Sequence, residues 1–176
     1  MEKEELSTKF ASMRFDLDRS IRYWSSRSVI WAAIVQAAAI ATAISGSAAI
    51  ATVSNCAGAS VAFAAVAALC GILSASFDAP NRARFCTERV SLYTDLLARC
   101  PADGSGEKET PELYEKIRAA RLRLESAETV ILECLDVECH NKTCRAMGID
   151  DEHPTTFIQR TVGRLFPIPY HAPRSK

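Results

Sequence analysis

The chain has 176 residues, with 21 basic and 21 acidic side chains and a mean hydropathy of +0.01. Its length excludes a large multidomain enzyme, and its averages alone describe a neutral soluble domain. The charges are unevenly spread, however, because residues 28–77 contain no Asp, Glu, Lys or Arg. This division indicates that two parts of the chain face different solvents.

Residues 1–27 are predicted to form a cytoplasmic amphipathic helix. Apolar residues recur at steps of three and four from Leu6 to Trp24, and charged residues occupy the opposite face. The first ten residues are polar and acidic, so we expect no cleavable secretory signal. We expect this helix to continue directly into the uncharged segment.

The uncharged segment, 28–77, has the length of two membrane spans, because a bilayer core about 30 Å thick needs about 20 helical residues. Small polar residues and glycines near its middle indicate a turn. We place the spans at 28–50 and 57–77, as a tight antiparallel transmembrane hairpin. Alanine makes each span only marginally apolar, which favours packing against other helices. The alternative is a soluble bundle that buries this segment in its own core.

Basic and aromatic residues flank both predicted spans, whereas the turn between them is uncharged. The positive-inside rule therefore places both termini in the cytoplasm. Aromatic rings near the start of the first span fit an interfacial belt. The residues predicted at the membrane interface are Arg22, Tyr23, Trp24, Arg27, Trp31 and Arg82.

Small residues recur at four-residue spacing on both spans and predict close helix packing. The helix-packing candidates are Ala37, Ala41, Ala64, Ala67 and Gly71. One hairpin cannot cover so many small faces, so we expect a homo-oligomer; tighter packing of a single hairpin is the alternative.

A pore through such an oligomer would be uncharged, because the spans contain no ionisable Asp, Glu, Lys, Arg or His. The same feature argues against a proton-coupled transporter. Hydroxyl groups in the spans can instead bond to their own helix backbone. The pore-lining candidates are Gln36, Thr42, Ser45 and Thr52.

Residues 78–146 are predicted to form a cytoplasmic helical domain. Pro80 predicts a break after the second span, before a helix at 81–99. Thr110 as a cap and Pro111 at the first helical position begin the next helix, which we expect to end within 137–144. This helical bundle is the expected surface for a partner or ligand.

Residues 147–176 are predicted to form an irregular tail. A short helix near 155–165 is the one regular element expected there. The prolines at 167, 169 and 173 exclude further helix.

The seven cysteines are an odd number and cannot all pair within the chain, so we interpret most of them as reduced thiols. Only one group of residues resembles a metal site, and it lacks the two close ligand pairs of a structural zinc site. We therefore expect no metal and no cofactor. The members of this group are Cys134, Cys139, His140, Cys144 and His153.

Catalytic motifs are weak. Arg164 and His171 have the loose spacing found in one ribonuclease class, in which a His acts as base and an Arg stabilises phosphate charge. Glycine-rich phosphate loops and metalloprotease motifs are absent from the sequence. The balanced charge gives no basic surface signal, so we expect neither enzymatic activity nor direct nucleic-acid binding.

The plan of the chain resembles the SLATT family of small two-helix bacterial membrane effectors. The resemblance rests on the lead-in that ends Ile21-Arg22-Tyr23-Trp24, on the uncharged hairpin, and on the helix that follows, with Ala83, Phe85 and Tyr93–Leu97. It covers roughly residues 6–135. The chain is similar, too, to the small membrane accessory proteins of some RNA-targeting CRISPR systems.

That resemblance implies an all-α membrane protein that permeabilises the inner membrane in anti-phage defence, beside a nucleotide-signalling or CRISPR effector partner. We therefore expect a homo-oligomeric pore in the lipid bilayer, gated by the cytoplasmic helices. The alternatives are a membrane-tethered ribonuclease that uses Arg164 and His171, and a phage holin.

Overall fold

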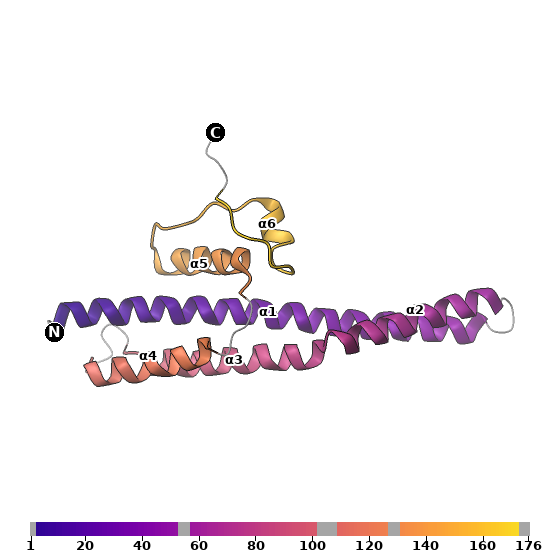
Figure 1. The fold of residues 1–176 in the computed structure, drawn as a ribbon, viewed down its shortest axis with the longest axis horizontal. Helices are drawn as coiled ribbons and strands as arrows, with labels where there is room; N and C mark the ends of the chain where they lie inside the picture. The colour runs from indigo at the N-terminus through magenta and orange to yellow at the C-terminus, as the bar shows by residue number, and fades with distance from the viewer. Residues whose placement is uncertain (1–2, 53–56, 102–108, 127–130, 173–176) are drawn as a thin grey trace. The chain divides into compact units, whose positions relative to one another are not determined.

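In the computed structural model, described here for residues 3–52, 57–101, 109–126 and 131–172, the chain is helical and these ranges contain no strand. Figure 1 shows the helices in chain order. They are α1 (Lys3–Thr52), α2 (Ala57–Ser76), α3 (Ala79–Arg99), α4 (Pro111–Glu125), α5 (Glu133–Met147) and α6 (Phe157–Thr161). The prediction of an all-α fold is confirmed.

The chain divides into two compact units. Unit 1 contains residues 1–26 and 87–176, and unit 2 contains residues 27–86. The predicted N-terminal helix, the cytoplasmic domain and the tail therefore belong to one unit, except that the first residues of α3 belong to unit 2. The predicted boundary at 146/147 does not separate two units, because the tail packs on α5.

α1 continues without a break from the amphipathic lead-in into the uncharged segment, as the sequence predicted. α2 ends at Ser76, and Asp78 takes a positive φ of 49° immediately before α3 begins. Pro80 lies in the first turn of α3, where its missing amide hydrogen is not needed. The predicted break between the second apolar helix and the next one is therefore confirmed.

The core of unit 1 forms around the N-terminal half of α1, which runs between α5 on one side and α3 and α4 on the other (Figure 1). The ring of Phe10 meets the ring of Tyr114 from α4 edge-on, with centroids 5.6 Å apart. The side chains buried completely at its centre are Phe10, Leu17, Tyr93 and Leu135. The alternation of apolar and charged positions along α1 thus buries one face against several helices.

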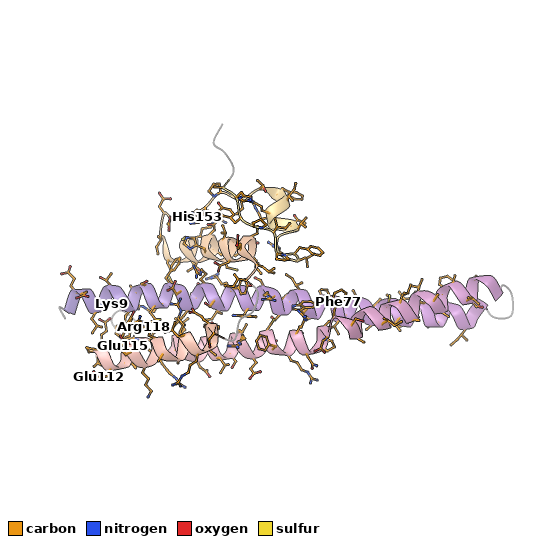
Figure 2. The ribbon with its side chains drawn as sticks, viewed as in Figure 1. Lys9, Phe77, Glu112, Glu115, Arg118 and His153 are labelled. Atoms are coloured by element: carbon orange, nitrogen blue, oxygen red, sulfur yellow. The ribbon has the colours of Figure 1, made fainter. Side chains whose placement is uncertain are left out.

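Charged side chains tie α1 to its neighbours at the edge of this core. Arg121 of α4 bonds to Asp16 at 2.5 Å, and Thr143 of α5 donates to Asp18 at 3.0 Å. Other charged side chains, such as the half-buried Lys9 and the exposed Arg118, lie outside the core (Figure 2). Unit 1 is therefore an ordinary soluble-type arrangement, with an apolar centre and a polar rim.

One predicted helix is two helices in the structure. α4 starts as expected, since the hydroxyl of Thr110 accepts the amide hydrogen of Leu113, but it ends at Glu125. α5 starts at Glu133 after an extended Leu132, whose amide donates to the buried hydroxyl of Tyr23. The apolar pattern runs through both helices, so periodicity alone predicted one longer helix and gave no sign of the contact between Leu132 and Tyr23.

The tail is more ordered than the sequence indicated. α6 begins with a capping box in which Thr156 and Gln159 satisfy each other's backbone amides. Gly163 lies so close to α5 that an added Cβ would sit 2.5 Å from the Cβ of Cys134, so only glycine fits there. The hydroxyl of Tyr170 then donates to the carbonyl oxygen of Pro154. The short helix predicted near 155–165 is confirmed, and the residues around it are packed rather than loose.

Candidate functional site

The large apolar side chains of unit 2 are the first candidate site, because they are exposed rather than buried. Ile50 is 80% exposed and Val61 is 69% exposed. We call this set the apolar surface: Val29, Ile34, Ile40, Ile44 and Ile50 of α1, with Val61, Phe63, Val66, Leu69 and Ile72 of α2. Phe77, at the end of the same segment, is 55% exposed (Figure 2).

By length and composition, α1 contains a stretch apolar enough to cross a membrane, within Glu4–Ala48, and 6% of its most apolar window is buried. Among the described residues, α2 contains a shorter apolar stretch, Gly58–Ile72. Both predicted spans, 28–50 and 57–77, are therefore helical, apart from the last residue of the second. Among the described residues, only α1 has an apolar stretch long enough to cross a membrane.

The pore-lining candidates occupy different surroundings. The hydroxyl of Thr42 donates to the carbonyl oxygen of Ala38 at 2.8 Å, which is the backbone-satisfying role that the sequence left open. Ser45 is buried, with 7% of its surface exposed, whereas Gln36 is exposed. The side chain of Thr52 lies outside the described residues.

A groove of about 750 Å³ lies between α1 and α2 within unit 2. Thr42 lines it from α1, and Cys70, Gly71 and Ala75 line it from α2. A Cβ added to Gly71 would meet no atom within 4 Å. The small residue at this position is thus not required by packing within one chain.

The other four packing candidates differ in how exposed they are. Ala41 and Ala67 are half-buried, but Ala37 and Ala64 are exposed. The exposed pair has room for another helix to approach closely, since alanine presents only a methyl group.

Two of the predicted interface residues are core residues instead. Tyr23 and Trp24 are 4% and 3% exposed in unit 1, with their rings edge-on at 5.4 Å. The prediction of a belt at the membrane surface is wrong for them, because so little of either ring remains accessible to lipid headgroups. A Tyr in a protein core and a Tyr at a membrane surface both place an apolar ring in an apolar region and give the hydroxyl a polar partner, so the sequence does not distinguish them. Here the hydroxyl of Tyr23 accepts the amide hydrogen of Leu132.

The remaining interface candidates lie on the surface of their units. Arg22 donates to Asp18 at 2.6 Å in unit 1. In unit 2, the guanidinium of Arg82 stacks over the ring of Trp31, 5.2 Å from its centroid, and Arg27 is half-buried. A cation–aromatic pair with a polar head and an apolar body suits the edge of a lipid-facing segment.

The two weak catalytic candidates are not joined by any contact among the described residues. The guanidinium of Arg164 binds both carboxylate oxygens of Glu138, at 2.8 and 2.5 Å. Burial raises the pKa of Glu138, but hydrogen bonds from Arg164 and Lys142 outweigh it and hold the pKa below its ordinary value. His171 is exposed, and its carbonyl oxygen accepts from Gln159. Arg164 is therefore committed to an ion pair that fastens the tail to α5.

A polar pocket of about 610 Å³ lies in unit 1, between α5 and the segment after it. Glu138 and Glu152 line it together with four cationic side chains, which gives a net charge of +2 with His153 neutral. Arg160 donates to the hydroxyl and the carbonyl oxygen of Thr155 and, among the described residues, contacts no carboxylate. The cationic side chains are Lys142, Arg145, Arg160 and Arg164. This excess of positive charge suits an anionic group.

The cysteines do not form a metal site among the described residues. All six described cysteines are free thiols, and Cys56 lies outside the described residues. Burial raises the pKa of Cys139 to about 11, so this thiol is protonated at neutral pH and a poor metal ligand. The thiol of Cys134 donates to the carbonyl oxygen of Ile168.

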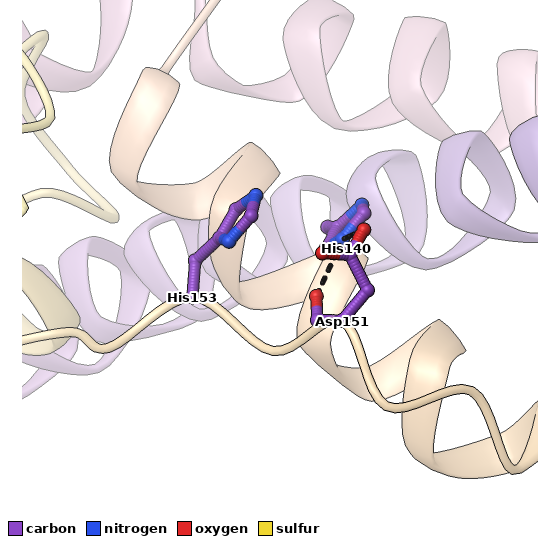
Figure 3. A group of neighbouring side chains, drawn as sticks. All are labelled: His140, Asp151 and His153. Atoms are coloured by element: carbon purple, nitrogen blue, oxygen red, sulfur yellow. Dashed lines mark hydrogen bonds and ion pairs between the residues drawn. The ribbon is translucent and has the colours of Figure 1, made fainter.

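The structure instead gathers His140 and His153, two members of the group that the sequence indicated, with Asp151, which the sequence patterns did not single out (Figure 3). Asp151 was missed because a carboxylate eleven residues from a histidine fits no familiar ligand spacing. The signal that could have found it is the pair Asp151-x-His153 directly after Gly148, where a helix is expected to end.

Comparisons with protein-family models, with curated proteins and with solved structures returned no match. They neither support nor oppose the resemblance to the SLATT effectors. That resemblance rests on the lead-in, the uncharged segment and the helix after it.

Proposed function

We propose that this chain is a homo-oligomeric pore or permeabilising effector of the bacterial inner membrane, built from a two-helix transmembrane hairpin. One observation carries the proposal: unit 2 exposes its large apolar side chains, in a segment without a charge. Burying a side chain of this size contributes about 1.5–3 kcal/mol. Covering ten that are roughly half exposed therefore contributes on the order of 10 kcal/mol.

A folded domain has only about 5–15 kcal/mol of stability in total, so exposure on this scale is unfavourable in water. Lipid is the covering that fits, because the apolar residues lie on both α1 and α2 and are accompanied by few polar groups. The soluble alternative, burial of this segment in the chain's own core, is not favoured by the 6% burial of the most apolar window of α1.

Oligomerisation is supported by the small residues that remain exposed on both helices. Ala37 and Ala64 leave space for the backbone of a second helix. In lipid, helices associate by close packing rather than by the hydrophobic effect, so small residues make better contacts than bulky ones. An uncharged polar side chain, Gln36, lies next to Ala37 in the sequence and would then face the interior of the assembly. A path lined this way carries no fixed charge and would dissipate ion gradients.

We propose that unit 1 carries the gate, and the support is that α1 is one continuous helix that supplies residues to both units. The residues of α1 that α4 and α5 hold, such as Asp16 and Asp18, are continuous with its apolar half. By resemblance to the SLATT effectors, the trigger would be a nucleotide-signalling or CRISPR partner in anti-phage defence, with both termini in the cytoplasm.

The test is release of a self-quenching dye from vesicles of phosphatidylethanolamine and phosphatidylglycerol at high protein-to-lipid ratio. The wild-type chain should release the dye and should run as an oligomer in mild detergent. Ala37→Leu and Ala64→Leu should insert normally but lose release, since added bulk prevents close approach of a second helix. Val61→Leu, which adds one methylene on the apolar surface, is the matched control and should keep release.

Sealed vesicles that contain inserted wild-type protein, together with a monomeric mass in detergent, would contradict the pore. His171→Ala distinguishes the ribonuclease alternative, because it should leave dye release unchanged. If His171→Ala instead abolishes the effect on cells while Ala37→Leu and Ala64→Leu both keep that effect, the function is enzymatic.

A further inference from the structure

Two imidazole rings and one carboxylate share a small space on the surface of α5 (Figure 3). Candidate ligand atoms of His140, Asp151 and His153 all lie within 4.8 Å of one another. Nε2 of His140 lies 3.4 Å from a carboxylate oxygen of Asp151 and 3.0 Å from its carbonyl oxygen. The two imidazole rings are stacked, with centroids 4.9 Å apart and an angle of 7° between their planes.

One of these distances is that of a metal site, and a second can become so when the ring of His153 turns out of its stacked position. Zinc binds imidazole nitrogen and carboxylate oxygen at about 2.0–2.2 Å, so two ligands at tetrahedral angles lie about 3.3–3.5 Å apart. The His140–Asp151 separation of 3.4 Å already falls in this range. His153 is exposed and can bring a ring nitrogen closer by turning about its own side-chain bonds.

The ring of His140 is held in place before any ion arrives. Its side chain is 15% exposed, and the ring of Phe15 from α1 meets it edge-on at 5.2 Å. Asp151, whose side chain is 62% exposed, and His153 leave the outer side of the group open to solvent. One ligand is therefore fixed and two are accessible, which gives an ion an entry path.

The segment that carries the other two ligands is fastened to α5 by contacts that leave their side chains free to bind. Gly148 ends α5 in the left-handed conformation and turns the chain back. The buried side chain of Asn141 then accepts the amide hydrogen of His153 at 2.8 Å and donates to its carbonyl oxygen at 2.7 Å. Arg145 adds a bidentate ion pair to Glu152, between the two ligands. Backbone placement of this kind pre-organises a site.

We propose that His140, Asp151 and His153 bind one divalent transition-metal ion, of the class that prefers imidazole and carboxylate ligands, for which Zn²⁺ is the probe. The three protein ligands leave a coordination position for water or for the carbonyl oxygen of Asp151. The bound ion cross-links the segment after α5 to α5 itself. This inference concerns unit 1 alone and does not depend on the proposed pore.

The experiment uses the full chain in detergent, stripped with a chelator and titrated with Zn²⁺ by calorimetry, and with Co²⁺ as a coloured substitute. One ion should bind per chain, and the thermal unfolding midpoint should rise by several degrees, because an ion that binds only the folded state stabilises it. Co²⁺ should give visible d–d bands without the near-ultraviolet charge-transfer band of a thiolate ligand, which separates this site from one made by cysteines.

His153→Ala removes an exposed ligand and should lower Zn²⁺ affinity by more than about 100-fold while the metal-free protein unfolds as before. His171→Ala is the matched control, since it removes the one remaining histidine of the chain, and should bind as the wild type does. Asp151→Asn should fall between them. Absence of stoichiometric binding, a thiolate band, or equal affinity in His153→Ala and His171→Ala would each overturn the proposal.

Discussion

Unit 1 and unit 2 are made of the same kind of element, and α1 and α3 both contribute to each of them, yet they place their apolar residues in opposite positions. In unit 1, Phe10, Leu17 and Tyr93 are completely buried. In unit 2, Ile50 and Val61 are mostly exposed, and the described residues that are buried are Ser45, Ala79 and Cys86. The same chain thus follows the rule for water in one unit and violates it in the other.

The two units also differ in where their polar side chains find partners. Charged side chains of unit 1 bridge its segments, for example from Arg121 of α4 to Asp16 of α1 and from Arg164 in the tail to Glu138 of α5. The spans proposed in unit 2 contain no charge, and Thr42 turns its hydroxyl to its own backbone. The contrast teaches that the solvent of a helix can be inferred from where its polar groups find partners, as well as from its hydropathy.

The sharpest way to break the comparison is to remove the core of unit 1. Phe10→Ala should cost about 3–5 kcal/mol in the free energy of unfolding, because it leaves a cavity. The matched control, Leu122→Ala, removes a side chain that is 53% exposed and should cost about 0.5 kcal/mol or less. Denaturant unfolding in a Trp31→Phe background, followed by the fluorescence of buried Trp24, measures both. Equal effects would mean that unit 1 has no defined core.

A charge in unit 2 tests the other half of the comparison. Ile40→Arg, near the middle of the first predicted span, should disfavour membrane insertion by about 3 kcal/mol, on the order of 100-fold. Ile158→Arg, at a 65% exposed apolar position of unit 1, should leave insertion unchanged. The fraction of chain that resists alkaline extraction from membranes measures both. If Ile40→Arg stays in the membrane fraction at the wild-type level, unit 2 does not lie in lipid.

The smallest expected effect concerns the ion pair of Glu138 and its dependence on pH. The pKa of Glu138 is lowered in the folded chain, so the ion pair stabilises unit 1 at pH values above the ordinary value of 4.5 and is lost as pH falls through the lowered value. Glu138→Gln should therefore cost about 1–2 kcal/mol near pH 7, at the lower end for a charged hydrogen bond because Arg164 is partly exposed.

The control for that variant is Glu115→Gln, which removes an exposed carboxylate 3.5 Å from Arg118 and should have almost no effect. Unfolding midpoints measured from pH 7 to pH 3 should converge for the wild type and Glu138→Gln in acid. If the difference between them does not shrink as the pH falls, the stabilisation by Glu138 is not ionic.

The sequence predicted the helices of unit 2 and the break after the second of them well, while the predicted turn between them lies outside the described residues. An uninterrupted lead-in, a second apolar helix and a break before Pro80 all follow from local rules about charge, length and proline. The start of α4 at Thr110 and Pro111 was predictable for the same reason. Where a residue type itself restricts the backbone conformation, a helix start or break can be predicted without knowing which elements pack nearby.

The sequence failed where a residue's role depends on contacts with distant parts of the chain. Tyr23 and Trp24 fit an interfacial belt by their position, but Leu132, directly before α5, supplies Tyr23 with a buried hydrogen-bond partner. The division of α4 from α5 and the packing of the tail, with Gly163 against Cys134, likewise depend on contacts between distant segments. Propensity carries no information about such contacts.

By itself, the sequence determined that the chain is all-helical, that one continuous helix joins a charged to an uncharged half, and that residues 28–77 contain no ionisable Asp, Glu, Lys, Arg or His. These features depend on composition and short-range periodicity. Only the tertiary structure decided that Arg164 is engaged by Glu138, and that His140, Asp151 and His153 meet on α5. The reason is physical: ion pairs and ligand sets need side chains a few ångströms apart, and for residues separated by up to 26 positions only the folded chain sets that distance.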